Sequence, residues 1–590
     1  MNSLWRTGSN MKKLAPLLFL ALALGARQGA AIDGQTGDFK WSWGTTLTYG
    51  LGLRLDDPDQ RIIGLAAGGT AFSVNGDDGN QNYRKGIFTN AGKVTTELQL
   101  SYKNVGGFVR AFAFYDYENE HDNRARTPLS DEALKRVGSR AEIRDAFLWY
   151  RFNLGSLPGE LRAGWQVINW GESTFFQGGI NAINPVDVSA LRVPGAEVRD
   201  ALLPVGAVKL SLKPSKSTSF EAFYQYAWAE TKIDAVGSYF STSDLAGAGA
   251  NKVLLGFGQV PDTLPVGYPI NQPTGAVVPR GGDRGAKDGG QWGASFKLLT
   301  NILGGAEFGL YYMNYHSRLP VIMAQTGSLA GVGNKNYAAT AQYFLAYPED
   351  IQLAGFSFNT QLGRTGIALQ GEVSHRWDVP LQIDDVELLY AALSPLSAFL
   401  AANNQVGAYG FSQEITGYKK YQTTQVQMTA TKAFSRVLGA SQAVLVAEAA
   451  WHKVHDLPEQ SVLRLEAPGT YTSGNPIFTS ARVQPATEPS SAFPTTSSWG
   501  YVLAGRLEYG NAIGAVNLTP RFSFAHDVNG ISPGPGGSFL EGRMALTVGL
   551  GFQYRINWEA DVSYTSFWGA DRYNLLGDRD FIAANIKYSF

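Results

Sequence analysis

The chain lacks cysteine altogether and has few charged residues for its length. Without Cys, a disulfide-stapled scaffold and a thiolate metal site are excluded, and the absence suits an oxidising envelope compartment. Charged residues make up 17% of the 590 residues, and the formal net charge is −1. A nucleic-acid-binding protein would carry a basic excess, so this class is also excluded.

Long apolar runs are missing beyond the N-terminus. Lys12 and Lys13 precede the apolar run 14–24, and small residues follow at 29–31, which is typical of a secretory signal. We therefore predict a signal peptide over 1–31, with Met11 as an alternative start. No later run reaches the roughly 18 residues that a spanning helix needs, so the mature chain could cross a membrane only as a closed barrel, whose backbone groups are all paired internally.

Apolar and polar residues alternate along many segments. In the last one, 579–590, Ile582, Ile586 and Phe590 share one face and Asn585 and Lys587 the other. Such a strand, ending in a C-terminal Phe, resembles the closing strand of bacterial outer-membrane barrels. The segment 39–55 alternates in the same way over a length sufficient to cross a membrane as a tilted strand.

About eighteen such segments occur, and the connections between them alternate in length. Short ones such as 104–107, 153–159 and 300–304 separate long ones such as 231–287 and 456–496. Short periplasmic turns and long outer loops are the topology of an outer-membrane barrel, whereas a soluble β-sandwich has no reason to sort loop lengths. We predict an all-β, antiparallel outer-membrane β-barrel of about 18 strands, with 16 as the alternative, forming one domain over 32–590 in the bacterial outer membrane.

The alternation also predicts which side chains face the lumen. The lumen candidates form a polar but charge-balanced set: Arg110, Asp116, Asp145, Arg151, Arg162, Gln166, Glu372 and Arg376. The aromatic residues Phe112 and Phe114 share the register of Arg110, although that strand fits either register.

The third outer loop, 170–204, combines several Gly and Pro residues with an apolar side. Such a loop can fold into the barrel, since irregular backbone is tolerated at membrane depth when it is buried in protein; an ordinary exposed loop held by Asx turns is the alternative. The constriction or binding candidates are Trp170, Glu172, Phe175, Phe176, Asn181, Asn184, Asp187 and Arg192.

The block 161–205 resembles the most distinctive part of a proteobacterial outer-membrane family filed as domain of unknown function 1302. The segments 41–55, 75–86 and 526–543 are similar to further blocks of it. The resemblance implies an outer-membrane barrel. The family's gene context, beside systems for steroids, polyesters and hydrocarbons and beside envelope transporters of the resistance-nodulation type, implies a hydrophobic cargo. The family has no agreed catalytic or binding residues to carry over.

Two outer loops carry further signals. The loop 378–418 contains an apolar stretch, partly helical in spacing, that favours equally a hydrophobic capture surface and a lid packed on the barrel mouth. Asp77, Asp78, Asn80 and Asn82 offer closely spaced oxygens, as a Ca²⁺ site would. Because Asp and Asn beside glycine more often form turns, we predict no metal site and no cofactor.

A hydrolase is the main rival from another class. It needs a Ser and a His on the same face, but Ser374 and His375 are adjacent and so point to opposite faces, and no nucleophile-elbow motif is present. An adhesin would use long outer loops without needing the Gly/Pro block of the third loop. We therefore predict a channel, not an enzyme.

We expect the channel to pass a hydrophobic or amphipathic small molecule passively, with a general or polar-solute porin as the alternative. The partners expected are outer-membrane lipid, the hydrophobic solute, and periplasmic or inner-membrane transport components.

Overall fold

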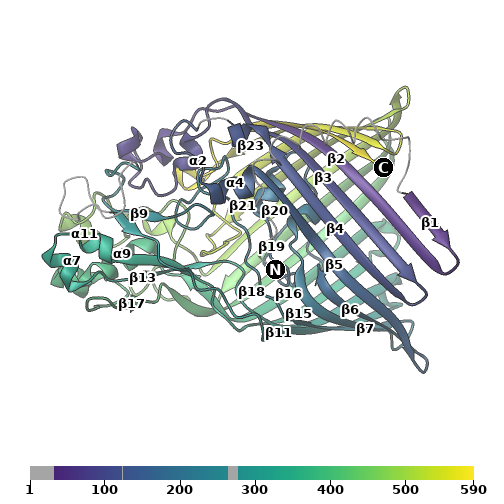
Figure 1. Cartoon of the computed structure of the whole chain (residues 1–590), viewed down its shortest axis with the longest axis horizontal. Helices are drawn as coiled ribbons and strands as arrows, with labels where there is room; N and C mark the ends of the chain where they lie inside the picture. The colour runs from purple at the N-terminus through teal and green to yellow at the C-terminus, as the bar shows by residue number, and fades with distance from the viewer. Residues whose placement is uncertain (1–31, 122–123, 263–276) are drawn as a thin grey trace.

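The structure is a computed structural model that describes residues 32–121, 124–262 and 277–590. The predicted signal peptide and the alternative start at Met11 lie outside the described residues. The described residues form a long barrel with a layer of loops and short helices gathered at one end (Figure 1).

Eighteen antiparallel strands among the described residues form the barrel wall. They are β2 (Phe39–Arg54), β3 (Gly86–Tyr102), β4 (Val105–Asp116), β5 (Ser139–Leu154), β6 (Leu157–Gln166), β7 (Val205–Leu212), β8 (Thr218–Gln225), β11 (Gln291–Thr300), β12 (Ala306–Tyr315), β15 (Ile351–Gln361), β16 (Ile367–Gln382), β18 (Tyr418–Val437), β19 (Ala440–Val454), β20 (Ser497–Ile513), β21 (Val516–Asn529), β22 (Met544–Tyr554), β23 (Trp558–Trp568) and β24 (Phe581–Ser589). Each pairs with its neighbours in sequence, and β24 closes the barrel by pairing with β2 from Thr46↔Ser589 to Arg54↔Phe581. The predicted barrel is confirmed, with eighteen strands and not sixteen.

The connections at the two ends differ as the sequence predicts. At the end near β1 (Ile32–Thr36), which pairs with the start of β2, the strands are joined by tight turns. Leu438 and Gly439 join β18 to β19 with φ of 52° and 79°, the left-handed backbone of a two-residue hairpin turn. Long loops connect the strands at the opposite end, where the helices lie (Figure 1). This end is therefore the outer one.

The outer loops contain ten α-helices and two small sheets among the described residues. The helices are α2 (Asp78–Gln81), α3 (Tyr117–His121), α4 (Asp131–Val137), α5 (Val188–Arg192), α6 (Val198–Ala201), α7 (Leu329–Gly333), α8 (Tyr337–Thr340), α9 (Asp385–Ala392), α10 (Ala398–Asn403) and α11 (Pro476–Ser480). Two small sheets pair β9 (Lys252–Leu254) with β10 (Val277–Pro279), and β13 (Val321–Gln325) with β14 (Gln342–Ala346) and β17 (Glu414–Ile415). Within the described ranges, every helix is too short or too polar to span a bilayer.

The barrel wall is apolar outside and polar inside. Leu148, Trp165 and Leu310 expose 66%, 50% and 57% of their surface on the outer face, whereas wall residues such as Gln166 and Glu372 are buried inside. Outward apolar side chains belong against hydrocarbon. The chain is thus an outer-membrane β-barrel, as predicted.

The strand boundaries and one register differ from the predicted ones. The strand predicted from about 92 begins at Gly86, and β6 ends at Gln166, so that Trp170 lies in the following loop. In β5 the pairing with β4 shifts between Val109 and Ala111. This bulge turns both Arg144 and Asp145 inward, although simple alternation would place Arg144 outside.

The topology predicts which loops are reachable from outside the cell. Since the chain has no native cysteine, single-cysteine variants can be labelled cleanly with a bulky, membrane-impermeant maleimide. Val462→Cys, in the outer loop between β19 and β20, should label on intact cells because Val462 is exposed. Asn301→Cys, in the turn between β11 and β12, is equally exposed but should label only after the outer membrane is permeabilised. Equal labelling of both on intact cells would contradict the strand order.

The two faces of β24 predict opposite responses to a charge. Ile586 is 43% exposed on the outer face, so Ile586→Arg puts a cation into hydrocarbon, at a cost of about 2–4 kcal/mol at mid-depth and less toward the interfaces. Asn585 lies opposite Asp561 on the lumen side, and Asn585→Arg should be milder. The measurement is unfolding in detergent micelles, followed by heat-dependent gel migration. A larger loss of stability in Asn585→Arg would mean that the register of β24 is wrong.

Candidate functional site

The third outer loop, residues 167–204 between β6 and β7, folds into the barrel and contacts its wall at many points. Two wall carboxylates hold its first half. Glu372 on β16 accepts hydrogen bonds from the backbone N–H groups of Glu172 (2.5 Å) and Ile180 (2.7 Å). Glu448 on β19 accepts from those of Thr174 (3.3 Å) and Phe175 (2.6 Å). Both carboxylates are nearly completely buried, so each needs these donors to compensate for lost hydration.

The second half of the loop is held by ion pairs with the opposite part of the wall. Asp187 is fully buried, and its Oδ2 lies 2.8 Å from Arg140 and 3.2 Å from Arg144, both on β5. The two arginines hold the pKa of Asp187 below its usual value despite its burial. Its Oδ1 accepts from the N–H of Ala190 at 3.0 Å and so caps α5.

The helix α6 continues this anchoring to the closing strands. Asp200 pairs with Lys93 on β3 at 2.6 Å, and Glu197 with Lys587 on β24 at 2.9 Å. The loop therefore crosses the lumen, because its anchors lie on β16 and β19 at one end and on β3 and β24 at the other.

Apolar packing and glycines fix the path of the loop. Ile168, Trp170, Ile180 and Ile183 form a buried cluster with residues of β7, β8, β12 and β15. A Cβ atom at Gly179 would overlap the Glu372 carboxylate, and one at Gly171, where φ is 90°, would also lie too close to it, at 2.4 Å. Glycine at these positions lets the loop backbone lie directly on the wall carboxylate.

The eight constriction candidates differ in their contacts and exposure. Some hold the loop: Trp170 donates to Glu221 at 2.9 Å, and Asn184 accepts from Ile168 N–H and donates to Leu203 O. Others are accessible: Phe175 is 40% exposed and Asn181 is also exposed. Glu172 accepts a hydrogen bond from Asn359, and the ring of Phe176 contacts that of Phe539. Asp187 forms the ion pairs described above. Arg192 pairs with Asp234, and its guanidinium lies over the ring of Phe240.

The lumen candidates are engaged in pairs or with the loop. Arg110 pairs with Asp145, and Arg151 and Arg162 both pair with Glu160 at 2.9 Å. Asp116 accepts from Thr89 and Asn119, and Gln166 donates to Ala207 O. Arg376 donates to Gly179 O and thus supports the loop beside Glu372. The lumen is polar, and its charges are largely compensated.

Several side chains that anchor the loop were not among the site residues predicted from the sequence. Glu448, Lys93, Glu197 and Asp200 all contact the loop or the wall within the lumen. An isolated acid at 448 amid Ala and Val of an alternating strand is the one signal that marks an inward group. The partners of Lys93 and Lys587 could not be found locally, because they lie far away in the sequence.

The loop 378–418 takes part in a cavity at the outer end. Its helix α9 packs Val386 and Tyr390 against Leu400 and Phe478, while Leu388, Leu389 and Leu393 line a cavity of about 130 Å³. The other lining residues come from distant loops and include Phe72, Leu254, Phe257, Ala338 and Tyr343. The loop therefore packs against other outer loops and also presents an apolar surface to a cavity.

The closely spaced oxygens of the first outer loop do not act together. Asn80 accepts a hydrogen bond from Arg54. Asn82 accepts hydrogen bonds from the backbone N–H groups of Arg126 and Thr127 and donates one to Gly237 O. Asp77 and Asp78 instead lie beside Asp244 of the fourth outer loop, which sequence analysis missed. Burial, with a smaller effect of the Asp262 charge, raises the pKa of Asp77 to about 8 and that of Asp78 to about 6.

Ser374 and His375 lie on opposite faces of β16. Ser374 is buried in the lumen, and its hydroxyl donates a hydrogen bond to Gly178 O. His375 instead forms a hydrogen bond of 2.8 Å with the hydroxyl of Thr424 on β18. The two side chains therefore cannot share a proton, as the argument against a hydrolase requires.

Comparison with solved structures gives distant likenesses. OccAB3 of Acinetobacter baumannii is 10% identical, with a TM-score of 0.42 over 93% of this chain and 99% of that chain. A BenF-like porin from Pseudomonas fluorescens Pf-5 is 8% identical, with a TM-score of 0.40 over 94% and 99%. OpdK of Pseudomonas aeruginosa, solved with vanillate, is 10% identical, with a TM-score of 0.38 over 93% and 98%.

No curated protein matches the sequence. The family model described as protein of unknown function (DUF1302) matches residues 12–590, so this chain belongs to the DUF1302 family.

Proposed function

We propose that the protein is a passive outer-membrane channel for amphipathic small molecules with a largely apolar body. The observation that supports this most is the apolar cavity among the outer loops, on the same chain as a barrel whose lumen is crossed by the third loop. In this proposal the solute enters the cavity, passes the third loop, and is received by periplasmic or inner-membrane transport components. The protein acts as a channel and not as an enzyme.

The cavity has the size and lining for part of such a solute. Its volume of about 130 Å³ is close to the roughly 150 Å³ of an apolar protein cavity that holds benzene. One aromatic ring or a short alkyl segment would therefore fit. Leu388, Leu389 and Leu393 supply much of the apolar surface, and burial of apolar area is the main source of affinity for such a group.

One polar group in the cavity supports an amphipathic solute over a purely apolar one. Tyr343 lines the cavity and is 4% exposed, and its hydroxyl has no hydrogen-bond partner among the described residues. A buried hydroxyl without a partner costs about 1–3 kcal/mol. A solute with one polar atom beside its apolar body would recover this cost.

A channel for polar solutes is the second candidate. It is favoured by the paired charges of the lumen, such as Arg110 with Asp145 and Arg521 with Asp561, which offer a polar path without strong charge selection. The two candidates differ in whether the outer cavity matters for passage.

Opening the third loop should widen the channel. Replacing residues 175–194 with a short Gly/Ser linker should raise single-channel conductance in planar bilayers and relax selectivity. The wall should stay folded because its ladder hydrogen bonds lie elsewhere, and Arg140 and Arg144 would then face water. Unchanged conductance in a folded variant, checked by heat-dependent gel migration, would mean that the loop is not the constriction.

Two point variants complement the loop replacement: one removes an anchor of the loop at Glu448, and the other, at Glu508, is its matched control. Glu448→Ala removes the acceptor of the Thr174 and Phe175 N–H groups, so conductance should rise, but less than in the loop replacement. Glu508→Ala removes an inward acid that pairs with Arg506 and should change conductance less than Glu448→Ala does.

Filling the outer cavity should block the proposed solute selectively. Ala392 on α9 lines the cavity, so Ala392→Phe should lower uptake of a radiolabelled alkylphenol by a deletion strain that carries the variant. Uptake of a monosaccharide should not change. Ala402→Phe, on the exposed face of α10, is the matched control and should behave as wild type.

Removal of the Tyr343 hydroxyl tests the proposed polar contact in the same assay. Tyr343→Phe should lower uptake of the alkylphenol more than that of the corresponding alkylbenzene, by up to about tenfold for one hydrogen bond. Ala392→Phe could instead reduce the uptake of the alkylphenol and of the monosaccharide equally, or reduce the uptake of neither. Either result would contradict the proposed amphipathic solute and favour the polar-solute channel.

A further inference from the structure

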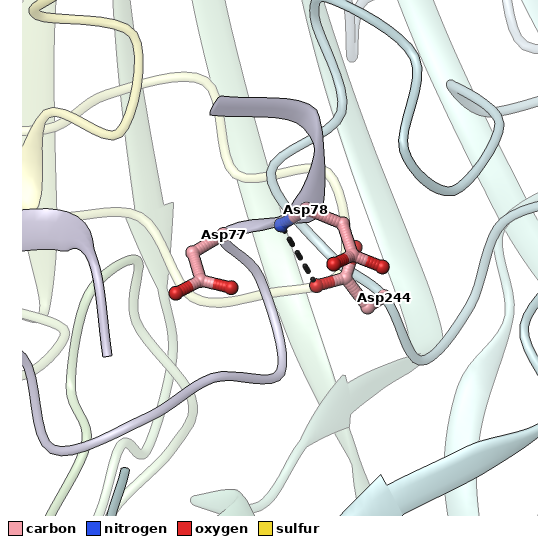
Figure 2. Close-up of side chains that lie close together, drawn as sticks. All are labelled: Asp77, Asp78 and Asp244. Carbon is pink, nitrogen blue, oxygen red and sulfur yellow. Dashed lines mark hydrogen bonds between the residues drawn. The ribbon is translucent and has the colours of Figure 1, made fainter. Parts of the chain in front are cut away.

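Three carboxylates from two distant outer loops converge in the layer above the barrel. Asp77 and Asp78 belong to the first outer loop and Asp244 to the fourth, and one oxygen from each lies within 4.8 Å of the others. Figure 2 shows the three side chains together, with the Asp78 backbone N–H donating to Asp244 Oδ2 at 3.3 Å. This hydrogen bond satisfies one oxygen of Asp244.

Two oxygens of the cluster are buried and lack a hydrogen-bond donor among the described residues. Asp77 is 1% exposed; its Oδ2 accepts from Gly64 N–H at 2.7 Å, but its Oδ1 has no partner. Oδ1 of Asp244 is likewise buried and has no partner. A buried acceptor without a partner is costly, and more so when it is charged. A cation bound between the carboxyl groups would interact favourably with both atoms.

The surroundings offer oxygens and room, and two basic groups near the cluster contact Asp262. A cavity of about 130 Å³ adjoins the cluster, and Asp78, Asp244, Asp262 and Thr127 contribute to its lining. Arg126 pairs with Asp262 at 2.8 Å, and Lys252 donates to the backbone oxygen of Asp262. The cavity has space for the water molecules that would complete a coordination shell.

The donor set selects the class of ion. All ligands are oxygens, and the chain contains no cysteine, which favours a hard cation over zinc or copper. Calcium takes 6–8 oxygen ligands at about 2.3–2.6 Å in flexible geometry, so two of its ligands can lie up to about 5 Å apart. The three oxygens lie within 4.8 Å of one another, which is compatible with this range; Mg²⁺ requires ligands at about 2.0–2.1 Å and a stricter octahedron.

We propose that Asp77, Asp78 and Asp244 bind one Ca²⁺ ion that ties the first outer loop to the fourth. The two loops already meet next to this cluster, where Asn75 exchanges hydrogen bonds of 2.8 and 2.9 Å with the backbone of Leu254. Asn75 and Leu254 also line the apolar cavity of the outer loops. The ion would therefore stiffen one wall of that cavity, but its binding does not depend on which solute the channel passes.

The test uses the purified full-length mature protein in detergent, stripped of metal with a chelator and titrated with CaCl₂ by isothermal calorimetry. Wild type should bind one Ca²⁺ per chain, with weaker binding of MgCl₂, and Ca²⁺ should raise the temperature at which the outer loops lose protection from protease. In Asp78→Asn/Asp244→Asn, the Ca²⁺ affinity should fall by at least about tenfold, and the protease protection should no longer respond to Ca²⁺.

Asp57→Asn is the matched control, since Asp57 lies in the same loop and pairs with Lys85 on the surface. It should bind Ca²⁺ as wild type does. Because the double variant relieves like-charge repulsion, its barrel should fold; heat-dependent gel migration checks this, and the single variant Asp244→Asn serves if it does not. Wild-type protein that binds no Ca²⁺, or a folded Asp244→Asn variant with unchanged affinity, would overturn the proposal.

Discussion

The wall of this barrel must pair all of its own backbone N–H and C=O groups, because hydrocarbon offers no hydrogen-bond partners. The pairing of β24 with β2 meets this requirement by leaving no free edge. Closure then fixes the distribution of side chains: alternate residues face lipid, and the others face an enclosed space. Polar groups such as Gln166 and Glu372 are consequently buried inside, while Leu148 and Trp165 are exposed outside.

An interior of this kind determines how the third loop is held. An apolar core would bind the loop through apolar side chains alone, whereas this wall presents buried carboxylates that accept backbone N–H groups. Glu372 and Glu448 each receive two such donors from the loop, and charge-assisted bonds of this type are stronger than neutral ones. Glu372 and Glu448 lie on strands whose register is fixed by pairing with their neighbours. The position of the loop therefore follows from the strand register.

The sequence is sufficient to predict what depends on local periodicity. Alternation along segments such as 39–55 and the sorting of loop lengths predict the barrel, a strand number of about 18 and the inward register of Glu372. Features that depend on departures from periodicity or on distant pairing are not predictable in this way. The bulge in β5 turns Arg144 inward against the alternation, and Asp244 meets Asp77 only because two loops more than 150 residues apart are packed together.

The outer loops follow the opposite rule from the wall. They lie in water, so their apolar residues pack inward, as Val386, Leu400 and Phe478 do around α9. Neighbouring loops are joined by short backbone pairings such as that of β13 with β17, which are much shorter than the ladders of the wall. Side-chain contacts such as the Asn75 bonds to Leu254 also fix the mutual positions of the loops. A bound ion or solute that contacts two loops can therefore strengthen the packing of this layer, whereas the wall is held by its own ladders of hydrogen bonds. Regulation of passage is for this physical reason expected in the loops, where the apolar cavity and the carboxylate cluster share the residues between them.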